Sequence, residues 1–483
     1  MGLTGILLGL ALLIGFAYRG WSVLLLAPLA ALVAAVAAGE PLLAHWTQTF
    51  MQAAAGFFAQ FFPLFLLGAL FGKLMEDSES VGAIARFMTD KLGTGRAVLA
   101  VVLAGALVTY GGVSLFVAIF VLVPMGQALF RAAGIPNRLM PAAVMLGTST
   151  FTMSALPGTP AIQNAIPMPF FGTTPFAAPG LGLIASAIML GFGLWWLARV
   201  ERAARRAGEG FGDAPAGADA ASEDILVRER ATVAREFDPA EIHHGRHAQQ
   251  GPHIAVALLP LLAVILVNLT MSLIVLPRLD TSYLAEDRWG GASLSSVGGV
   301  WSVIVALASA IVIAILLNRG RLPALRETVD AGLNASVLPV VSVASLVGFG
   351  AVVAALPAFA MVRDWVLGIE GGPLVGLAVA TNVLAALTGS ASGGLTIALG
   401  ALGDTYMQIA SEQGIAPALL HRVAVIGAGT LDCLPHNGAV VTLLALCGAK
   451  HKGSYFDIVM VGIVGAVIAL VAVIILGSVL GSF

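Results

Sequence analysis

The sequence predicts an all-α polytopic membrane protein made of two inverted-topology repeats, each with a re-entrant hairpin and a broken transmembrane helix. Three observations predict this fold class. Hydrophobic residues make up 59% of the 483 residues and charged residues only 10%, whereas a soluble domain carries about a quarter charged residues. The 57 glycines and 23 prolines interrupt the apolar runs, and hydrocarbon tolerates interrupted helices only beside protein or a wet cavity. Segments of the two halves also match in order.

Apolar runs long enough to cross a membrane, which takes about 20 helical residues, are found along most of the chain. They lie near 2–17, 21–38, 57–75, 178–198, 253–277, 297–317 and 455–481. The first run is short, lacks a basic N-terminal region and is followed by Arg19, so we expect a retained span rather than a cleaved signal peptide. Residues 200–250 are polar and lack apolar periodicity, which indicates a linker between two membrane halves.

The distribution of Lys and Arg predicts the orientation, because cytoplasmic loops hold the excess of these residues. With the linker in the cytoplasm, 20 of the 24 basic residues fall there, and the four outside are Arg278, Arg288, Arg363 and Arg422. This count requires segments 97–130 and 373–403 to enter and leave on the same side, so we expect both to be re-entrant hairpins. The expected location is the inner (plasma) membrane, with a cytoplasmic linker and both termini periplasmic.

The two hairpins belong to an internal repeat, in which residues 93–161 match residues 371–440 at an offset of 278–280. TYGGVSLF and LPGTPA in the first half correspond to LTGSASGGL and LPHNGA in the second. Each half crosses an odd number of times, so the second is inverted, and such repeats place the substrate near the membrane midplane. The predicted domains are residues 1–199 (hairpin 97–130, broken helix 138–167), the linker 200–250, and residues 251–483 (hairpin 373–403, broken helix 418–448).

Hydroxyl and amide side chains gather with glycine and proline at the two hairpin tips and the two helix breaks. Unwound backbone at helix N-termini exposes N–H groups that bind anions, so an organic anion can be held there without Lys or Arg. For any single Ser or Gly, close helix packing is the alternative explanation. The expected substrate-binding residues are Tyr110, Gly111, Gly112, Ser114, Thr148, Ser149, Thr150, Gly389, Ser390, Ser392, His436 and Asn437.

Asp432 is a carboxylate inside one of these breaks, where a charge is costly unless it is protonated or paired. His436 lies four residues further on and titrates near neutral pH, although a lone intramembrane His is more often structural. The expected cation-coupling residues are Asp432, His436, Thr388 and Asn164. H+ is the favoured coupling ion and Na+ the alternative, because hydroxyl, amide and carbonyl oxygens also suit an alkali cation.

Other features exclude competing functions. The formal net charge of -2 argues against a nucleic-acid surface, and no G-x-x-x-x-G-K-[ST] loop is present to bind ATP. An intramembrane protease is disfavoured because Asp404 lacks the expected motif, and a channel because inverted hairpins indicate alternating access. No enzyme activity, cofactor or metal site is expected. The 57–75 span ends in three charged residues, Lys73, Glu76 and Asp77, and we expect them to anchor this end of the span at the membrane surface.

The run GALFGKLMEDSESVGAIARFMTDKLG, the TYGGVSLF hairpin, the ALPGTPAIQNAIP break and the GSASGGL tip resemble the gluconate:proton symporter (GntP) family of the ion transporter superfamily. The resemblance covers most of both halves and implies an elevator-type secondary carrier, often a homodimer, that takes up a small organic anion with H+. Gluconate-type members have Tyr-Glu where this chain has Tyr110 and Gly111, and a His-containing break at 155–158. GSASGGL and LDCLPHNGA are more similar to members that transport D-3-hydroxybutyrate and related short-chain acids.

Overall fold

The computed structural model describes residues 2–17, 19, 21–212, 248, 250–435, 437–449 and 451–483. Most of the predicted linker, including its histidines, and His436 lie outside the described residues. Within the described ranges the regular structure is entirely helical, with no strand. Helices long and apolar enough to cross a membrane are among them, so the predicted all-α polytopic fold class is confirmed.

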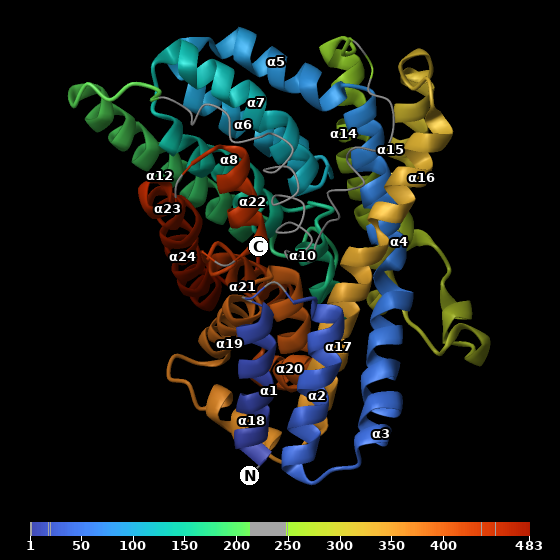
Figure 1. Cartoon of the computed structure of the whole chain (residues 1–483). Helices are drawn as coiled ribbons and strands as arrows, with labels where there is room; N and C mark the ends of the chain where they lie inside the picture. Colours follow the sequence, from blue (N-terminus) through green and yellow to red (C-terminus); the bar gives the residue numbers. More distant parts are fainter. Residues whose placement is uncertain are drawn as a thin grey trace.

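Each half begins with two helices and then a long bent helix. In the first half these are α1 (Gly2–Ala17), α2 (Val23–Ala38), and the continuous series α3 (Leu42–Ala44), η1 (His45–Phe50) and α4 (Met51–Asp77). In the second half they are α14 (Ile254–Thr270), α15 (Leu294–Leu317), and the pair α16 (Leu325–Ala335) and α17 (Val337–Ala355). The helices α4 and α17 lie side by side along one side of the molecule (Figure 1).

Each half continues with a short helix, a helical hairpin, a broken helix and a long final helix. The first half has α5 (Ser80–Leu92), α6 (Ala97–Tyr110), α7 (Leu115–Ala133), α8 (Met140–Thr148), α9 (Phe151–Ser154), α10 (Ile162–Ala165), α11 (Pro167–Phe171) and α12 (Pro179–Arg206). The second half has α18 (Phe359–Leu367), α19 (Pro373–Thr388), α20 (Ala391–Gln413), α21 (Pro417–Thr430), α22 (Gly438–Leu446), α23 (His451–Ile458), η10 (Val459–Val464) and α24 (Gly465–Leu480). The order of elements therefore repeats, as the two-repeat fold class requires.

Proline and polar side chains explain where the repeated helices break. After α9 ends at Ser154, the segment that leads to α10 contains Pro157 and Pro160, which lack the N–H that would continue a helix. After α21 ends at Thr430, the chain restarts at α22, where the Asn437 side chain accepts hydrogen bonds from the backbone N–H groups of Ala439 and Val440. This is a side-chain N-cap, and it fixes the second break.

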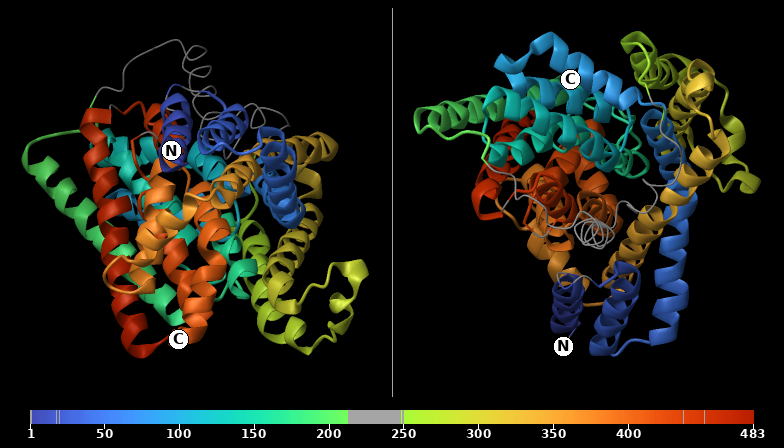
Figure 2. Two further views of the ribbon diagram at one scale, coloured as in Figure 1. Left: turned by 90° about the horizontal axis from the view of Figure 1, so that it is seen from below. Right: turned by 45° about the horizontal axis from the view of Figure 1, so that its top comes forward.

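The two hairpins approach each other from opposite parts of the molecule. α5 lies at the top of Figure 1 and α18 at the bottom, each leading into the hairpin of its own half. α5 and α6 meet at an angle of 102°, so α5 lies across the base of the first hairpin. The long final helices α12 and α24 lie against each other at one edge (Figure 2).

The boundaries differ from the predicted ones in two places. Helix α20 continues to Gln413, past the predicted hairpin end at residue 403. The apolar helix Leu325–Ala355 was not predicted as a span, because its first turns carry Arg326, Glu327 and Asp330. Those charges lower the local hydropathy, but they leave the apolar helix α17 intact.

The hairpin α19–α20 is closely packed at Gly394, where an added Cβ would clash with the backbone of Leu384 and Ala385. We expect Gly394→Ala to lower the free energy of unfolding by about 1–3 kcal/mol, because the two backbones must separate. Gly400 on the same helix has no atom within 4 Å of such a Cβ, so Gly400→Ala should be neutral or stabilising by up to about 1 kcal/mol. Thermal unfolding of both variants is measured in detergent, with the reaction of a maleimide with the buried Cys433 and Cys447 as the signal of unfolding. Equal melting temperatures of the two variants would contradict the packing argument.

Candidate functional site

A cavity of about 160 Å³ is lined by residues of both hairpin tips. The first tip contributes Thr109, Gly112, Val113 and Ser114, and the second contributes Ser392. The remaining walls come from α4, from the N-terminal part of α17 and from the broken segment of the first half, residues 160–163. The cavity therefore joins both repeats, as the inverted-repeat argument predicts for a substrate site.

The first tip is a tight turn whose backbone requires glycine. Gly112 has φ +100°, a conformation that other residues rarely adopt, and a Cβ there would lie 3.1 Å from the Pro160 ring. Ser114 ends the turn and accepts a hydrogen bond of 3.4 Å from the Val117 N–H at the start of α7. The tip therefore presents a helix N-terminus and a hydroxyl to the cavity, two features suited to an anion.

Three charged residues at the end of α4 are buried at this cavity. Lys73 Nζ lies 3.0 Å from Asp77 Oδ1 and 3.4 Å from Glu76 Oε2. Asp77 Oδ2 also accepts a 2.6 Å hydrogen bond from the Thr328 hydroxyl of α16. Lys73 and Glu76 line the cavity, and the three side chains are 0–6% exposed.

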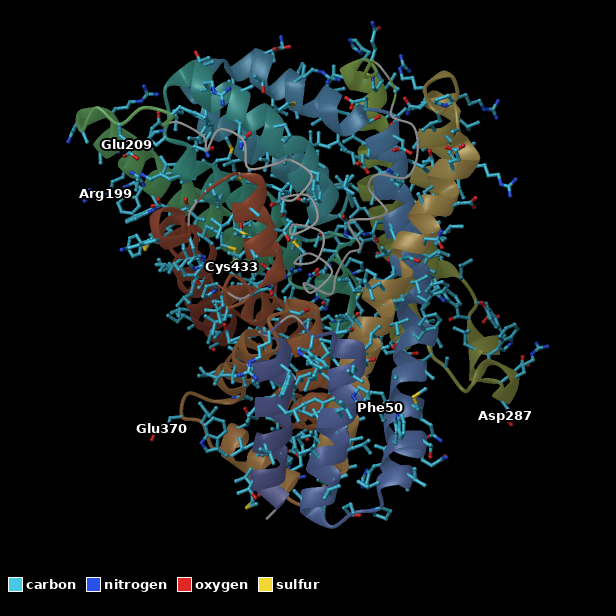
Figure 3. All side chains as sticks on the ribbon, in the orientation of Figure 1. Phe50, Arg199, Glu209, Asp287, Glu370 and Cys433 are labelled. Atoms are coloured by element: carbon cyan, nitrogen blue, oxygen red, sulfur yellow. The ribbon has the colours of Figure 1, made fainter. Side chains whose placement is uncertain are left out.

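The predicted surface anchor is therefore wrong. Helix α16 packs over this end of α4 at Gly332, where a Cβ would clash with the backbone of Leu70 and press on Lys73. Other charged residues differ from this cluster in their location, because they lie at the periphery of the molecule (Figure 3): Arg199, Glu209, Asp287 and Glu370. Taking a charge out of water costs several kcal/mol unless it is paired, so the buried cluster needs an explanation beyond anchoring.

A second polar network lies behind the tip of α19–α20. Asp432 Oδ1 accepts hydrogen bonds from the Ala391 N–H (2.9 Å) and from Asn437 Nδ2 (2.8 Å), and Asn437 Nδ2 also donates to the Gly389 carbonyl at 3.0 Å. The hydroxyl groups of Ser390 and Ser392 lie 3.1 Å apart. Since Ser392 lines the cavity, this network connects Asp432 to the cavity wall.

Of the expected site residues, the described structure thus brings Gly112, Ser114 and Ser392 together at the cavity. Gly389, Ser390, Asp432 and Asn437 lie in the adjoining network. Thr388 belongs to the same tip, where its hydroxyl donates to the carbonyls of Leu384 and Ser390. His436 lies outside the described residues.

The other expected residues make contacts inside the protein. The Tyr110 hydroxyl donates to the Pro157 carbonyl at 2.8 Å, and Gly111 allows close approach of Leu261 on α14. Thr148 and Thr150 donate to carbonyls one turn earlier in their own chain, and the Ser149 hydroxyl lies 3.1 Å from that of Thr148. These contacts stabilise the tip and the break next to the cavity.

Asn164 and Arg422 join the first break to α21 of the second half. Asn164 donates to the carbonyls of Thr159 and Pro175, and its Oδ1 lies 3.1 Å from His421 Nε2. Arg422 donates to the carbonyls of Ser154, Ala155 and Ala177. Arg422 is 0% exposed, so it is buried between the two halves and is not a solvent-exposed basic residue.

Lys73 and Glu76 line the cavity, and sequence reasoning did not include them in the candidate site. Their position at the end of an apolar run suggested a boundary with water. A signal was present, because Lys73, Glu76 and Asp77 have i, i+3 and i+4 spacing and share one helix face. In a chain with only 10% charged residues, a one-sided charged face on an apolar helix indicates a partner or a cavity.

Comparison with known proteins agrees with this architecture. No family model matches the chain. The uncharacterized transporter YxjC of Bacillus subtilis (strain 168) is 40% identical over 482 residues, which cover 98% of each protein. The chain belongs to the YxjC family of transporters. YxjC-family membership makes the chain a multi-pass membrane transporter.

Two solved structures share the fold of this YxjC-family chain at low sequence identity. Neisseria gonorrhoeae MtrF, reported with a class of antimetabolite efflux pumps, superposes with a TM-score of 0.55 at 15% identity, over 89% of this chain and 83% of MtrF. The Alcanivorax borkumensis YdaH transporter, whose topology is described as unusual, superposes with a TM-score of 0.52 at 17% identity, over 91% and 88% of the two chains. Both likenesses concern the fold alone.

Proposed function

We propose that this YxjC-family transporter is a secondary active carrier that imports a small organic anion together with H+. The observation that carries the proposal is the cavity lined by both hairpin tips and by the Lys73–Glu76 pair. Lys73 offers a cationic partner to a carboxylate, and the tips offer hydroxyl groups. The earlier expectation that hydroxyl and backbone N–H groups alone bind the carboxylate is therefore extended by Lys73.

The size of the cavity favours a short-chain hydroxy acid such as 3-hydroxybutyrate over a sugar acid such as gluconate. A cavity of about 150 Å³ in another protein accommodates benzene, with about six non-hydrogen atoms, and the cavity here is about 160 Å³. A hydroxybutyrate ion has about seven non-hydrogen atoms, close to the number in benzene, whereas gluconate has about thirteen, roughly twice as many as a cavity of this size accommodates. The resemblance of the GSASGGL and LDCLPHNGA segments to short-chain acid members of the gluconate:proton symporter family supports the same choice.

Two observations favour H+ over Na+ as the coupling ion. Glu76 in the cavity wall and Asp432 behind the second tip are carboxylates that can carry a proton. One oxygen ligand considered for Na+ is engaged elsewhere: Asn437 Oδ1 accepts hydrogen bonds from the backbone N–H groups that it caps at the start of α22. Na+ symport is the alternative. The resemblance to the gluconate:proton symporter family further implies that the hairpins move by an elevator mechanism and that the protein is a homodimer.

Transport by purified protein in liposomes tests this function. Labelled D-3-hydroxybutyrate should accumulate under an inward pH gradient without Na+, and unlabelled acid on the inside should drive saturable counterflow. Unlabelled gluconate, a keto acid and a neutral ester of the same acid should compete less well than 3-hydroxybutyrate. Accumulation that follows a Na+ gradient and ignores the pH gradient would replace H+ by Na+, and transport of none of the anions would refute the proposal.

We expect the 200–250 linker to be cytoplasmic and both termini periplasmic in the inner membrane. The Gly180 N–H at the start of α12 donates to the Phe483 carbonyl at 2.8 Å, while the linker follows the other end of this 28-residue helix, about 42 Å away at 1.5 Å per residue. An impermeant maleimide applied to cells with a permeable outer barrier should therefore label Ser482→Cys, and label Ala207→Cys only after the inner membrane is opened. Labelling of Ala207→Cys before opening would reverse the orientation.

A further inference from the structure

We propose that Lys73 and Glu76 form the site where substrate and proton are coupled: the carboxylate of the substrate replaces Glu76 as the partner of Lys73, and the released Glu76 takes the proton that travels with the substrate. This inference rests on the proposed function and names the residues that perform it. On the opposite side of the membrane the substrate leaves, Glu76 returns to Lys73, and its proton passes to water.

The geometry distinguishes a fixed partner of Lys73 from an exchangeable one. Asp77 is 0% exposed, lies 3.0 Å from Lys73 and is held on its other oxygen by Thr328 at 2.6 Å. Glu76 lies further from Lys73, at 3.4 Å, and lines the cavity together with it. A carboxylate that enters the cavity can therefore displace Glu76, whereas Asp77 keeps Lys73 in place.

The charge of the buried cluster explains why a proton must accompany the substrate. When Lys73, Glu76 and Asp77 all carry their charges, these three described side chains sum to one net negative charge. An entering anion would raise this to two negative charges at low dielectric, where like charges repel strongly. Protonation of Glu76 restores one net negative charge, so the loaded and empty sites have equal charge, and anion and proton bind together.

Within the residues that the structure describes, few other charged groups act on Glu76. They are Lys73, Asp77 and, at the start of α5, Glu79, and Glu79 itself pairs with Arg86 of α5 at 3.2 Å. Helices α15 and α17 carry no charged residue, and α7 carries only Arg131, in its last turn. On α16, the Arg326 and Asp330 side chains are 95% and 61% exposed, and Glu327 lies in the first turn. Burial favours the protonated form of Glu76 and Lys73 opposes it, so loss of Lys73 to an entering carboxylate favours protonation of Glu76.

The polar groups around the pair suit an acid that also has a hydroxyl. Gln163 lines the cavity and is 3% exposed, and its Oε1 accepts no hydrogen bond within the described part of the chain. An unpaired buried acceptor is costly, and a substrate hydroxyl can donate to it, whereas a keto oxygen cannot. Ser114 and Ser392 are further hydroxyl partners in the same cavity. The site thus prefers hydroxy acids to the matching keto acids.

The experiment compares three carboxylate variants in liposomes, with labelled D-3-hydroxybutyrate as the probe. Glu76→Gln mimics the protonated state, so pH-gradient-driven accumulation should fall at least about 10-fold, while substrate-for-substrate exchange at equal pH stays within about 3-fold of wild type. Asp457→Asn is the matched control, because Asp457 is a buried carboxylate paired with Arg138 and Trp196, remote from the cavity lining. It should keep both activities.

Asp432→Asn separates the failure of this inference from the failure of the proposed function. If wild-type protein accumulates the probe with H+ but Asp432→Asn is uncoupled and Glu76→Gln is not, proton symport stands and Glu76 is not the carrier. A folded Glu76→Gln protein that loses exchange as well would also overturn the inference, since Glu76 would then be needed for binding. If Glu76→Gln does not fold, Glu76→Asp decides: a shifted pH dependence of accumulation supports the inference, and an unchanged one refutes it.

Discussion

Replacement of Lys73 by Met is expected to lower kcat/KM for organic anion uptake at least about 30-fold. Truncating one partner of a buried charge pair costs about 2–5 kcal/mol, and about 1.4 kcal/mol corresponds to a factor of ten. The loss should appear in accumulation and in exchange alike, because the variant removes the positive charge that binds the substrate carboxylate. This pattern differs from that of Glu76→Gln, which should lose accumulation alone.

Two further variants show whether a loss of activity in Lys73→Met comes from lower stability or from the loss of the positive charge. Glu76 and Asp77 would remain buried without their cation, so the single variant is also expected to unfold at a lower temperature. Lys73→Met combined with Asp77→Asn removes one of these charges and should recover part of the stability but none of the uptake. Lys91→Met, at an exposed position of α5, is the matched surface control. If Lys73→Met transported anions at the wild-type rate, the cavity would not be the substrate site.

Much of the fold follows from local signals in the sequence. Long apolar runs specify helices with no other way to bury their backbone polar groups, and the matched segments 93–161 and 371–440 predict the repeat of hairpin and break. The helix Leu325–Ala355 was missed because α16 is amphipathic and charged at its start. Its second part, α17, is an apolar stretch that a local hydropathy window detects, so this span was predictable from the sequence.

Residues of the candidate site could be predicted where local composition identifies them, and could not be predicted where their burial depends on tertiary packing. Ser114 and Ser392 were identified because glycines and hydroxyl residues at a hairpin tip have a distinct composition, and both line the cavity. Lys73 and Glu76 were missed because their burial depends on the close approach of α16 at Gly332, far away in sequence. The count of basic residues that predicted the orientation included Arg422. Such a count cannot recognise an Arg that is buried against backbone carbonyls of the other repeat.

Arg422→Leu is expected to destabilise the protein by about 3 kcal/mol or more. The buried guanidinium donates to the carbonyls of Ala177 (2.6 Å), Ala155 (3.1 Å) and Ser154 (3.3 Å). Leaving a buried acceptor unsatisfied costs about 1–3 kcal/mol, and three acceptors would lose their donor together. The break of the first half would also lose one of its two attachments to α21 and keep the contact of Asn164 with His421, so the alignment of the hairpin tips should be weakened.

Arg422→Lys tests whether the planar fork of the side chain, rather than its charge, is required. An ammonium group is a compact point charge on a flexible stem and cannot reproduce the fixed fork of guanidinium donors, so we expect the Lys variant to melt between Arg422→Leu and wild type. Arg363→Leu is the control, because Arg363 is 45% exposed and pairs with its neighbour Asp364, and surface changes of this kind usually lie within about 0.5 kcal/mol. The melting temperature and the monodisperse fraction in detergent are measured for each variant. Wild-type stability of Arg422→Lys would mean that the positive charge, and not the planar fork, joins the two repeats.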